Sequence, residues 1–203
     1  MAKQNRSAPV MQSVLDAVAE RLMAGDELLI RIPEICEATG VNYGSVYHHF
    51  GSREGVIDAA YNMIFTRLVE EDLAIFHRID DTIESFEEYV EIMGPVITSM
   101  SSGPERRARR AMRTRVVAAA STRPSLKILI GASQERLTAE LEVLTESAQN
   151  KRFLRDDIPA RSLSVLFQIL IFGRALDDIS AEPIDEAQWQ GMMGHLFLGL
   201  LAK

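Results

Sequence analysis

The chain has 203 residues, of which 47% are apolar and 25% charged, and its net charge of −7 leaves it within the range of an ordinary globular protein with one large or two small domains. A single cysteine excludes an intrachain disulfide framework and a cysteine-based zinc site. No apolar run is long enough to span a bilayer, and residues 1–11 lack the apolar core of a signal peptide, so we expect a cytoplasmic protein with no membrane partner.

The first predicted helix begins at Pro9, because proline fits the first turn of a helix, and it ends at Gly25. Its apolar side chains follow a four-residue spacing and are Val10, Val14, Val18 and Leu22. This stripe predicts an amphipathic helix whose apolar face packs on the elements that follow it.

Residues 31–50 predict a helix-turn-helix. A short apolar helix ends at Gly40, where a left-handed backbone costs glycine least, and Asn42 is a good N-cap for the next helix. That helix, residues 43–50, turns Val46 and Phe50 inward and offers hydrogen-bonding side chains outward. Two turns with this pattern are typical of a recognition helix that enters a DNA groove.

From Ser52 onward the pattern predicts further helices. The breaks between the later ones fall where glycine, proline and serine or acidic residues gather, at residues 101–104, 121–125, 155–159 and 180–185. No strand alternation interrupts this pattern. The sequence therefore predicts an all-α fold of about nine helices, with a helix-turn-helix DNA-binding domain in residues 1–55 and a larger ligand-binding and dimerisation domain in residues 56–203.

The N-terminal residues resemble the signature of the TetR family of bacterial transcriptional regulators. The matching elements are Ile35, Gly40-Val41, Gly44-Ser45-Val46-Tyr47, Phe50 and Ser52-Arg53. The resemblance implies a ligand-responsive DNA-binding regulator, a repressor that binds a pseudo-palindromic double-stranded operator as a homodimer and is released by a small apolar effector. No catalytic motif accompanies it, so we expect no enzymatic activity, no cofactor and no metal.

Carried onto this chain, the resemblance assigns DNA contacts to Arg31, Asn42, Tyr43, Gly44, Ser45, Tyr47, His48, His49 and Arg53. Gly44 has two interpretations, close approach of the backbone to DNA or tight packing on the first helix. The recognition helix has no Lys or Arg, and residues 1–60 hold five basic and eight acidic residues, a net charge of −3. Non-specific attraction to phosphates should therefore be weak, unless an arm with Lys3 and Arg6 reaches a minor groove.

Residues 104–115 hold six arginines. The favoured interpretation is a solvated face that pairs with the nine carboxylates of residues 70–91. The alternatives are contacts that couple the two domains, or capture of an acidic effector.

The later helices supply two more sets of candidates. Apolar and aromatic side chains of the central helices could line an effector pocket or form plain core, and these are Phe65, Phe86, Tyr89, Met93, Met112, Val116, Leu137 and Phe167. The last two helices are apolar around most of their circumference and need a second subunit to cover them. The candidate dimer contacts are Leu166, Leu170, Gly173, Trp189, Met193, Leu196, Phe197 and Leu200, with core packing as the alternative for Trp189.

A second function stays open on the same scaffold. It is a helical small-molecule-binding or interaction protein with little or no operator binding. The acidic N-terminal segment favours this alternative, and the Gly44-Ser45-Val46-Tyr47 sequence opposes it.

Overall fold

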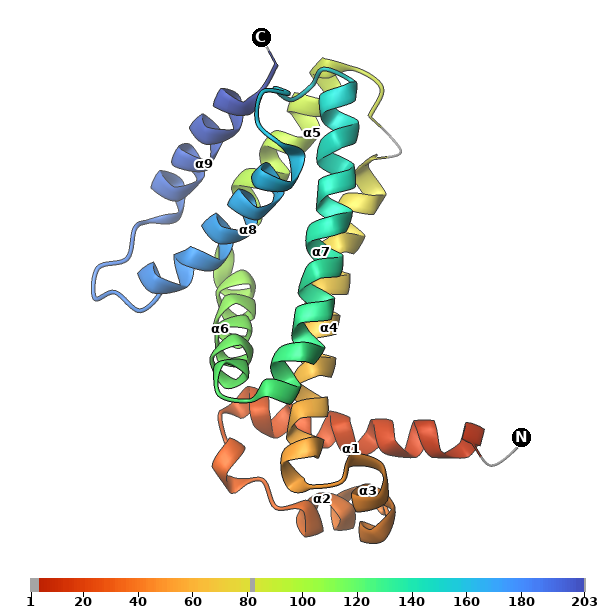
Figure 1. Ribbon diagram of the computed structural model, residues 1–203. Helices are drawn as coiled ribbons and strands as arrows, with labels where there is room; N and C mark the ends of the chain where they lie inside the picture. Colours follow the sequence, from red (N-terminus) through yellow and green to blue (C-terminus); the bar gives the residue numbers. More distant parts are fainter. Residues whose placement is uncertain (1–3, 81–82, 203) are drawn as a thin grey trace. The chain divides into compact units, whose positions relative to one another are not determined.

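The computed structural model describes residues 4–80 and 83–202, and the side chains of residues 9–77 and 83–202 (Figure 1). Within these ranges the chain forms nine α-helices and one 3₁₀ turn, which confirms the predicted all-α fold. The elements are α1 Gln4–Ala24, η1 Glu27–Leu29, α2 Ile32–Thr39, α3 Tyr43–Phe50, α4 Arg53–Asp80, α5 Phe86–Ser99, α6 Gly103–Ser121, α7 Pro124–Asn150, α8 Ala160–Asp177 and α9 Glu186–Leu200. None of the helices described is long and apolar enough to cross a membrane.

The chain divides into two compact units. The first unit consists of the residues up to Arg67 together with Val116–Ile130, and the second unit consists of Leu68–Arg115 and the residues from Gly131 onward. Three helices, α4, α6 and α7, therefore contribute residues to both units. The predicted functional boundary between residues 55 and 56 stays a prediction.

The core of the first unit forms where α1 meets the helices that follow it. Helix α1 begins at Gln4 rather than at Pro9, so Pro9 lies inside the helix, where it has no backbone N–H to donate. Val14, Val18 and Leu22 are fully buried as predicted, but Val10 is exposed and Met11 takes its place. A strict four-residue spacing drifts around the helix by about 40° at each step, so the end of the stripe leaves the core.

The second unit has a core of its own around α5 and α9, which pack against each other. Its buried members are Ile83, Tyr89, Ile97, Ala148, Phe153, Leu154, Trp189, Met193 and Phe197. Beyond α9, the backbone N–H of Ala202 donates to the Phe153 carbonyl at 3.0 Å, and the N–H of Arg155 donates to the Leu200 carbonyl at 2.9 Å. These two bonds join the last described residues to the α7–α8 connection.

Candidate functional site

The turn between α2 and α3 has the geometry that the sequence predicts. Gly40 adopts a left-handed conformation with φ 68°, and the next residue, Val41, is buried and donates its backbone N–H to the Cys36 carbonyl at 3.1 Å. The Asn42 side chain accepts the backbone N–H of Gly44 at 2.8 Å and so caps α3. Local backbone preferences therefore fix the direction in which α3 leaves the turn.

The outer face of α3 presents neutral hydrogen-bonding groups. Ser45, His48 and His49 are exposed and Tyr43 is half exposed, whereas Val46 is fully buried. The rings of Tyr43 and Tyr47 lie 4.5 Å apart between centroids. A hydrogen bond with Tyr43 raises the pKa of Tyr47, so the Tyr47 phenol remains protonated at neutral pH. This face can donate and accept hydrogen bonds at base edges or phosphates without carrying a guanidinium or ammonium charge.

Gly44 lies on the exposed side of α3. A Cβ built on Gly44 would meet the Asn42 Oδ1 atom at 3.1 Å, and among the described residues no atom of α1 lies within reach of it. The interpretation of Gly44 as a packing residue against the first helix is therefore wrong. Its lack of a side chain leaves the start of α3 open to solvent, in keeping with close approach to a ligand.

Two arginines that the sequence assigns to DNA are engaged inside the protein. Arg53 donates from Nε to the Ile30 carbonyl at 3.0 Å and from Nη2 to the Glu27 carbonyl at 2.7 Å. Arg31 donates from Nη1 to the Leu28 carbonyl at 2.9 Å, although its side chain remains exposed. Arg53 thus holds the segment before α2 while its side chain stays 30% exposed, and its contact with a phosphate stays a prediction. Lys3 and the side chain of Arg6 lie outside the described residues.

Gly55 at the start of α4 is required by the structure, although no sequence motif pointed to it. A Cβ on Gly55 would lie 2.0 Å from the Phe50 carbonyl oxygen, closer than any real contact allows. Gly51 has φ 78° at the same corner. Together these two glycines allow the chain to reverse tightly between the recognition helix and α4.

An ionic cluster that the sequence did not reveal lies within the first unit. Arg123, in the α6–α7 turn, forms ion pairs with Glu27 of η1 and Asp58 of α4, and Tyr61 donates to Glu27 at 2.7 Å. Burial alone would raise the pKa of Glu27, but the hydrogen bonds from Tyr61 and Arg123 outweigh it, so the pKa is lowered. The α6–α7 turn is thereby tied to the segment that leads into the helix-turn-helix.

A partly enclosed cavity of about 140 Å³ lies within the second unit. Of the eight predicted pocket residues, four line it: Tyr89, Met93, Leu137 and Phe167. The other four do not, since Phe86 borders a separate surface pocket and the remaining three lie away from both, namely Phe65, Met112 and Val116. Phe65 and Val116 are almost completely buried in the first unit, so their placement in the pocket is wrong.

The arginines of α6 pair with carboxylates as predicted, but they do not form a solvated face, because the side chains of Arg109 and Arg113 are 18% exposed and that of Arg110 is 5% exposed. One of the carboxylates, Asp178, also lies outside the predicted acidic stretch of residues 70–91. Asp72 of α4 forms ion pairs with Arg106, Arg109 and Arg113, and Asp178 forms two hydrogen bonds of 2.7 Å with Arg110. Four of these arginines, 106, 109, 110 and 113, and Asp72 also line the cavity. The cluster is therefore both an ion-pair network and a charged part of the cavity wall.

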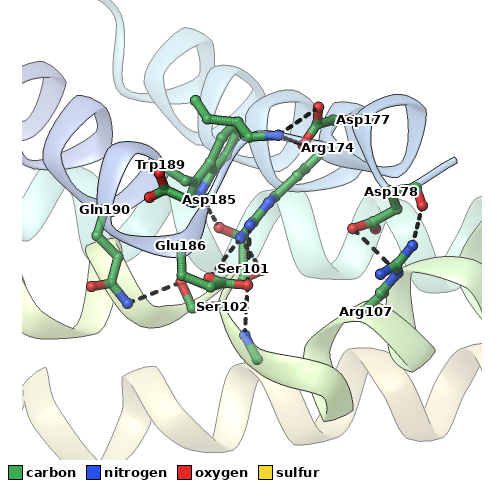
Figure 2. Close-up of polar contacts among 12 residues, drawn as sticks. Ser101, Ser102, Arg107, Arg174, Asp177, Asp178, Asp185, Glu186, Trp189 and Gln190 are labelled. Carbon is green, nitrogen blue, oxygen red and sulfur yellow. Dashed lines mark hydrogen bonds and ion pairs between the residues drawn. The ribbon is translucent and has the colours of Figure 1, made fainter. Parts of the chain in front are cut away.

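Helices α8 and α9 are held to the α5–α6 turn by a buried polar cluster (Figure 2). The Ser101 hydroxyl accepts a hydrogen bond from Trp189 Nε1, and the Ser101 carbonyl accepts one from Arg174 Nη1 at 2.7 Å. The Arg174 guanidinium lies 4.8 Å from the centroid of the Trp189 ring and forms an ion pair of 3.1 Å with Glu186. Trp189 is thus a core residue and not a dimer anchor, which corrects one of the two interpretations of the sequence.

The candidate dimer residues fall into a group that is buried within the second unit and a group that is exposed. Trp189, Met193 and Phe197 are buried in the second unit, so the prediction that they contact a second subunit is wrong for this conformation. Leu170 and Leu200 pack partly on the same core. Several exposed apolar positions lie along one face of each helix, at Leu166, Ile169, Gly173 and Leu176 of α8 and Met192, Leu196 and Gly199 of α9, while Val165 and Leu198 are exposed beside these faces. This exposed set contains only three of the predicted dimer residues, Leu166, Gly173 and Leu196.

The chain is similar to known regulators over most of its length. Residues 16–60 match the profile of the bacterial regulatory proteins of the tetR family. The HTH-type transcriptional regulator UidR of Escherichia coli (strain K12) is 24% identical over 181 residues, which is 89% of this chain and 87% of UidR.

Solved structures share the fold. A TetR-family transcriptional regulator from Mesorhizobium loti aligns with a TM-score of 0.72 at 15% identity, over 98% of this chain and 99% of that chain. A transcriptional regulator from Saccharomonospora viridis, in complex with choline, aligns with a TM-score of 0.71 at 14% identity, over 97% of this chain and 99% of that chain. Residues from both compact units are thus part of one known architecture.

Proposed function

We propose that this chain, whose residues 16–60 match the profile of the bacterial regulatory proteins of the tetR family, is a DNA-binding transcriptional regulator that acts as a homodimeric repressor in the cytoplasm. Each protomer inserts α3 into a major groove of a pseudo-palindromic operator, and a small effector in the cavity of the second unit releases the dimer. The observation that carries this proposal is the exposed hydrogen-bonding face of α3, on a helix whose turn and cap are fully formed.

Base and phosphate contacts come mainly from neutral groups in this proposal. Tyr43, Ser45 and His48 face outward on α3 and reach base edges, while Tyr47 and His49 contact phosphates. The exposed backbone at Gly44 allows a close approach to the DNA, and the Asn42 cap keeps the α3 N-terminus in position. Specificity then depends on hydrogen bonds and DNA shape, because the bidentate guanine contact of arginine is missing from α3.

The dimer in this proposal forms through α8 and α9. Their exposed apolar faces can close into a four-helix interface across a two-fold axis, and the exposed glycines Gly173 and Gly199 permit close helix approach. Leu166 and Leu196 are each 42% exposed in one protomer and become buried in the dimer. A charge at either position, as in Leu166→Glu or Leu196→Glu, should therefore give monomers in light scattering, whereas Val143→Glu on exposed α7 should not.

Release follows from the helices that the two units share. An effector in the cavity contacts Leu68 and Asp72 of α4, Leu137 of α7, and four arginines of α6, namely Arg106, Arg109, Arg110 and Arg113. Each of these helices also has residues in the first unit. A small displacement of the helices changes the separation of the two recognition helices. DNA affinity then falls, because both half-sites must be met at once.

The test is selection of bound duplexes from a random DNA pool by the purified protein at moderate and at low salt. Enrichment of a palindrome supports the proposal, and the salt dependence of its affinity should be shallow, with a log–log slope of about −4 or smaller in magnitude for the dimer. A steeper slope would indicate additional cations, with Lys3 and Arg6 as the first candidates.

A second function is favoured by one observation, namely that α3 has no cation and Arg53 is engaged internally. In that case the protein is a small-molecule-binding protein that has lost operator binding. Selection by a folded dimer that enriches no sequence at either salt concentration would reject the repressor and support this alternative.

A further inference from the structure

The charged part of the cavity wall is predominantly cationic. Among the described residues that line the cavity, five side chains are basic and one is acidic: Arg106, Arg109, Arg110, Arg113 and Lys151 against Asp72. Arg110 is neutralised by its two bonds to Asp178, and Lys151 donates to the Ile83 carbonyl at 3.2 Å. The other three guanidinium groups, those of Arg106, Arg109 and Arg113, all pair with Asp72.

Asp72 is shared by all three of these arginines. Its Oδ1 atom lies 2.8 Å from Arg109 and 3.5 Å from Arg106, and its Oδ2 atom lies 2.9 Å from Arg113. The side chain of Asp72 is 14% exposed and those of Arg109 and Arg113 are 18% exposed, so solvent screens this positive excess only partly. Glu71 also pairs with Arg109, but its side chain is 59% exposed and its charge is largely hydrated.

This imbalance is the electrostatic signature of a place for an additional anion. Buried charges require compensation by a partner, and the three arginines share Asp72 and the largely hydrated Glu71, so that cations outnumber carboxylates here. Burial is the main cause that lowers the pKa of Arg109, and the nearby charge of Arg113 lowers it further. A planar guanidinium matches a carboxylate or phosphate with two parallel hydrogen bonds.

The uncharged part of the cavity wall indicates what else a ligand must contain besides a charged group. Three of its neutral polar side chains are hydrogen-bonded within the wall, since Thr145 and Ser164 lie 3.1 Å apart and Gln168 donates to the Ser164 carbonyl at 3.0 Å. Most other lining side chains are apolar, including Leu137, Leu141 and Phe167. Such a surface binds an apolar body and offers little to a second polar group.

We propose that the effector is an apolar compound with a single oxyanion group, a carboxylate or a phosphate, which binds Arg106, Arg109 and Arg113 while its apolar body fills the rest of the cavity. This inference rests on the proposed function in that it takes the cavity as the effector site. It sharpens the sequence-based expectation of an apolar effector by adding a negative charge. A cationic effector is disfavoured, because the one lining carboxylate already serves three arginines.

The experiment uses two apolar bodies, each with four head groups. Octanoate and 4-phenylbutanoate are compared with the matching primary amides, alkyl phosphates and alkylammonium ions in titration calorimetry with the full-length protein. We expect the carboxylate or the phosphate of at least one body to bind about ten-fold more tightly than its amide, with the ammonium ion weakest. Whichever of the two anions binds better identifies the head group.

Arginine variants test whether the preference for an anion arises in the cavity. Arg106→Gln and Arg113→Lys should each reduce the preference for the anion over the amide, whereas Arg107→Gln should leave it unchanged. Arg107 is a matched control because it lies on α6 beside Arg106, is 56% exposed and does not line the cavity. Circular dichroism of each variant confirms that it is folded, and Arg106→Gln removes only one long contact of 3.5 Å.

Three results would overturn the proposal: amides or ammonium ions that bind as well as the anions, a preference that survives in both cavity variants, or no binding of any anion of either body. These readouts need no DNA. If anions bind but the DNA selection fails, the effector proposal stands and the repressor proposal falls. If the DNA selection succeeds but no anion binds, the repressor proposal stands and the effector proposal falls.

Discussion

The recognition helix α3 and the cavity wall of α6 differ in where the chain places its positive charge. Helix α3 is exposed and has no Lys or Arg, whereas α6 has six arginines within twelve residues and keeps several of them largely away from solvent. A DNA-binding surface usually gains affinity from phosphate-neutralising cations, so the opposite distribution would be expected. In the proposed repressor, α3 therefore contacts DNA without Lys or Arg, and the arginines of α6 serve the ion-pair network and the cavity wall.

The largest effect on stability should come from removing the Asp72 carboxylate, which pairs with three arginines of α6. Asp72→Asn leaves three guanidinium groups without their shared partner, and we expect the free energy of unfolding to fall by about 3 kcal/mol in urea denaturation. Glu71→Gln is the control, with a loss of about 0.5 kcal/mol, because that side chain is 59% exposed. Equal losses in the two variants would show that the buried arginines do not rely on Asp72.

The second prediction compares a glycine-to-alanine substitution in the first unit with one in the second unit. Gly55→Ala puts a methyl group 2.0 Å from the Phe50 carbonyl oxygen, and we expect a loss of about 2 kcal/mol in the free energy of unfolding. Gly131→Ala in α7 meets no described atom within 4 Å and should stabilise by about 0.5–1 kcal/mol. Thermal denaturation of both variants checks the pair, and a neutral Gly55→Ala would mean that the α3–α4 corner can relax.

A smaller effect concerns DNA reading by neutral groups. Tyr43→Ala removes an exposed ring from α3, and we expect operator affinity to fall about ten-fold in fluorescence anisotropy, with no change in stability. Ile128→Ala provides the control, because Ile128 is exposed in the same unit and has no proposed contact. Unchanged affinity in Tyr43→Ala would place DNA recognition on a different surface.

The smallest effect depends on pH. The pKa of Glu27 is lowered in the folded protein from its ordinary value of 4.5, so its contribution to stability is present above that value and is lost as the pH falls through the folded pKa. Glu27→Gln should lose about 1 kcal/mol at pH 7 in urea denaturation, and the difference from the unchanged protein should shrink below pH 4.5. A difference that stays constant down to acid pH would show that the Glu27 charge does not stabilise the fold.

The helix-turn-helix could be predicted because its determinants are local. Gly40, Asn42 and Val46 act on neighbours within a few residues, and backbone preferences alone decide what they do. The inward turn of Arg53 could not be predicted in the same way, because its carbonyl partners lie 23 and 26 residues earlier in the chain. The need for glycine at position 55 could not be predicted either, because the clash that a Cβ would make there depends on how α3 and α4 meet.

The cavity shows a different limit. Helical periodicity indicates that Phe65, Tyr89 and Leu137 are buried, but it does not indicate which buried side chain borders empty space. Only Tyr89 and Leu137 do so. On α9 the broad apolar surface indicates cover on two sides, but it does not indicate which side the chain itself covers. The structure assigns Met193 and Phe197 to the inner side.

The single cysteine offers a way to follow the helix-turn-helix by itself. Cys36 is 8% exposed on α2, and burial raises the pKa of its thiol, so a thiol reagent in solution reaches it only when the helices around it separate. Its rate of labelling therefore measures how often the helix-turn-helix opens locally. No label has to be introduced for this measurement, and the rate with and without operator or effector reports how each ligand changes the lifetime of the closed bundle.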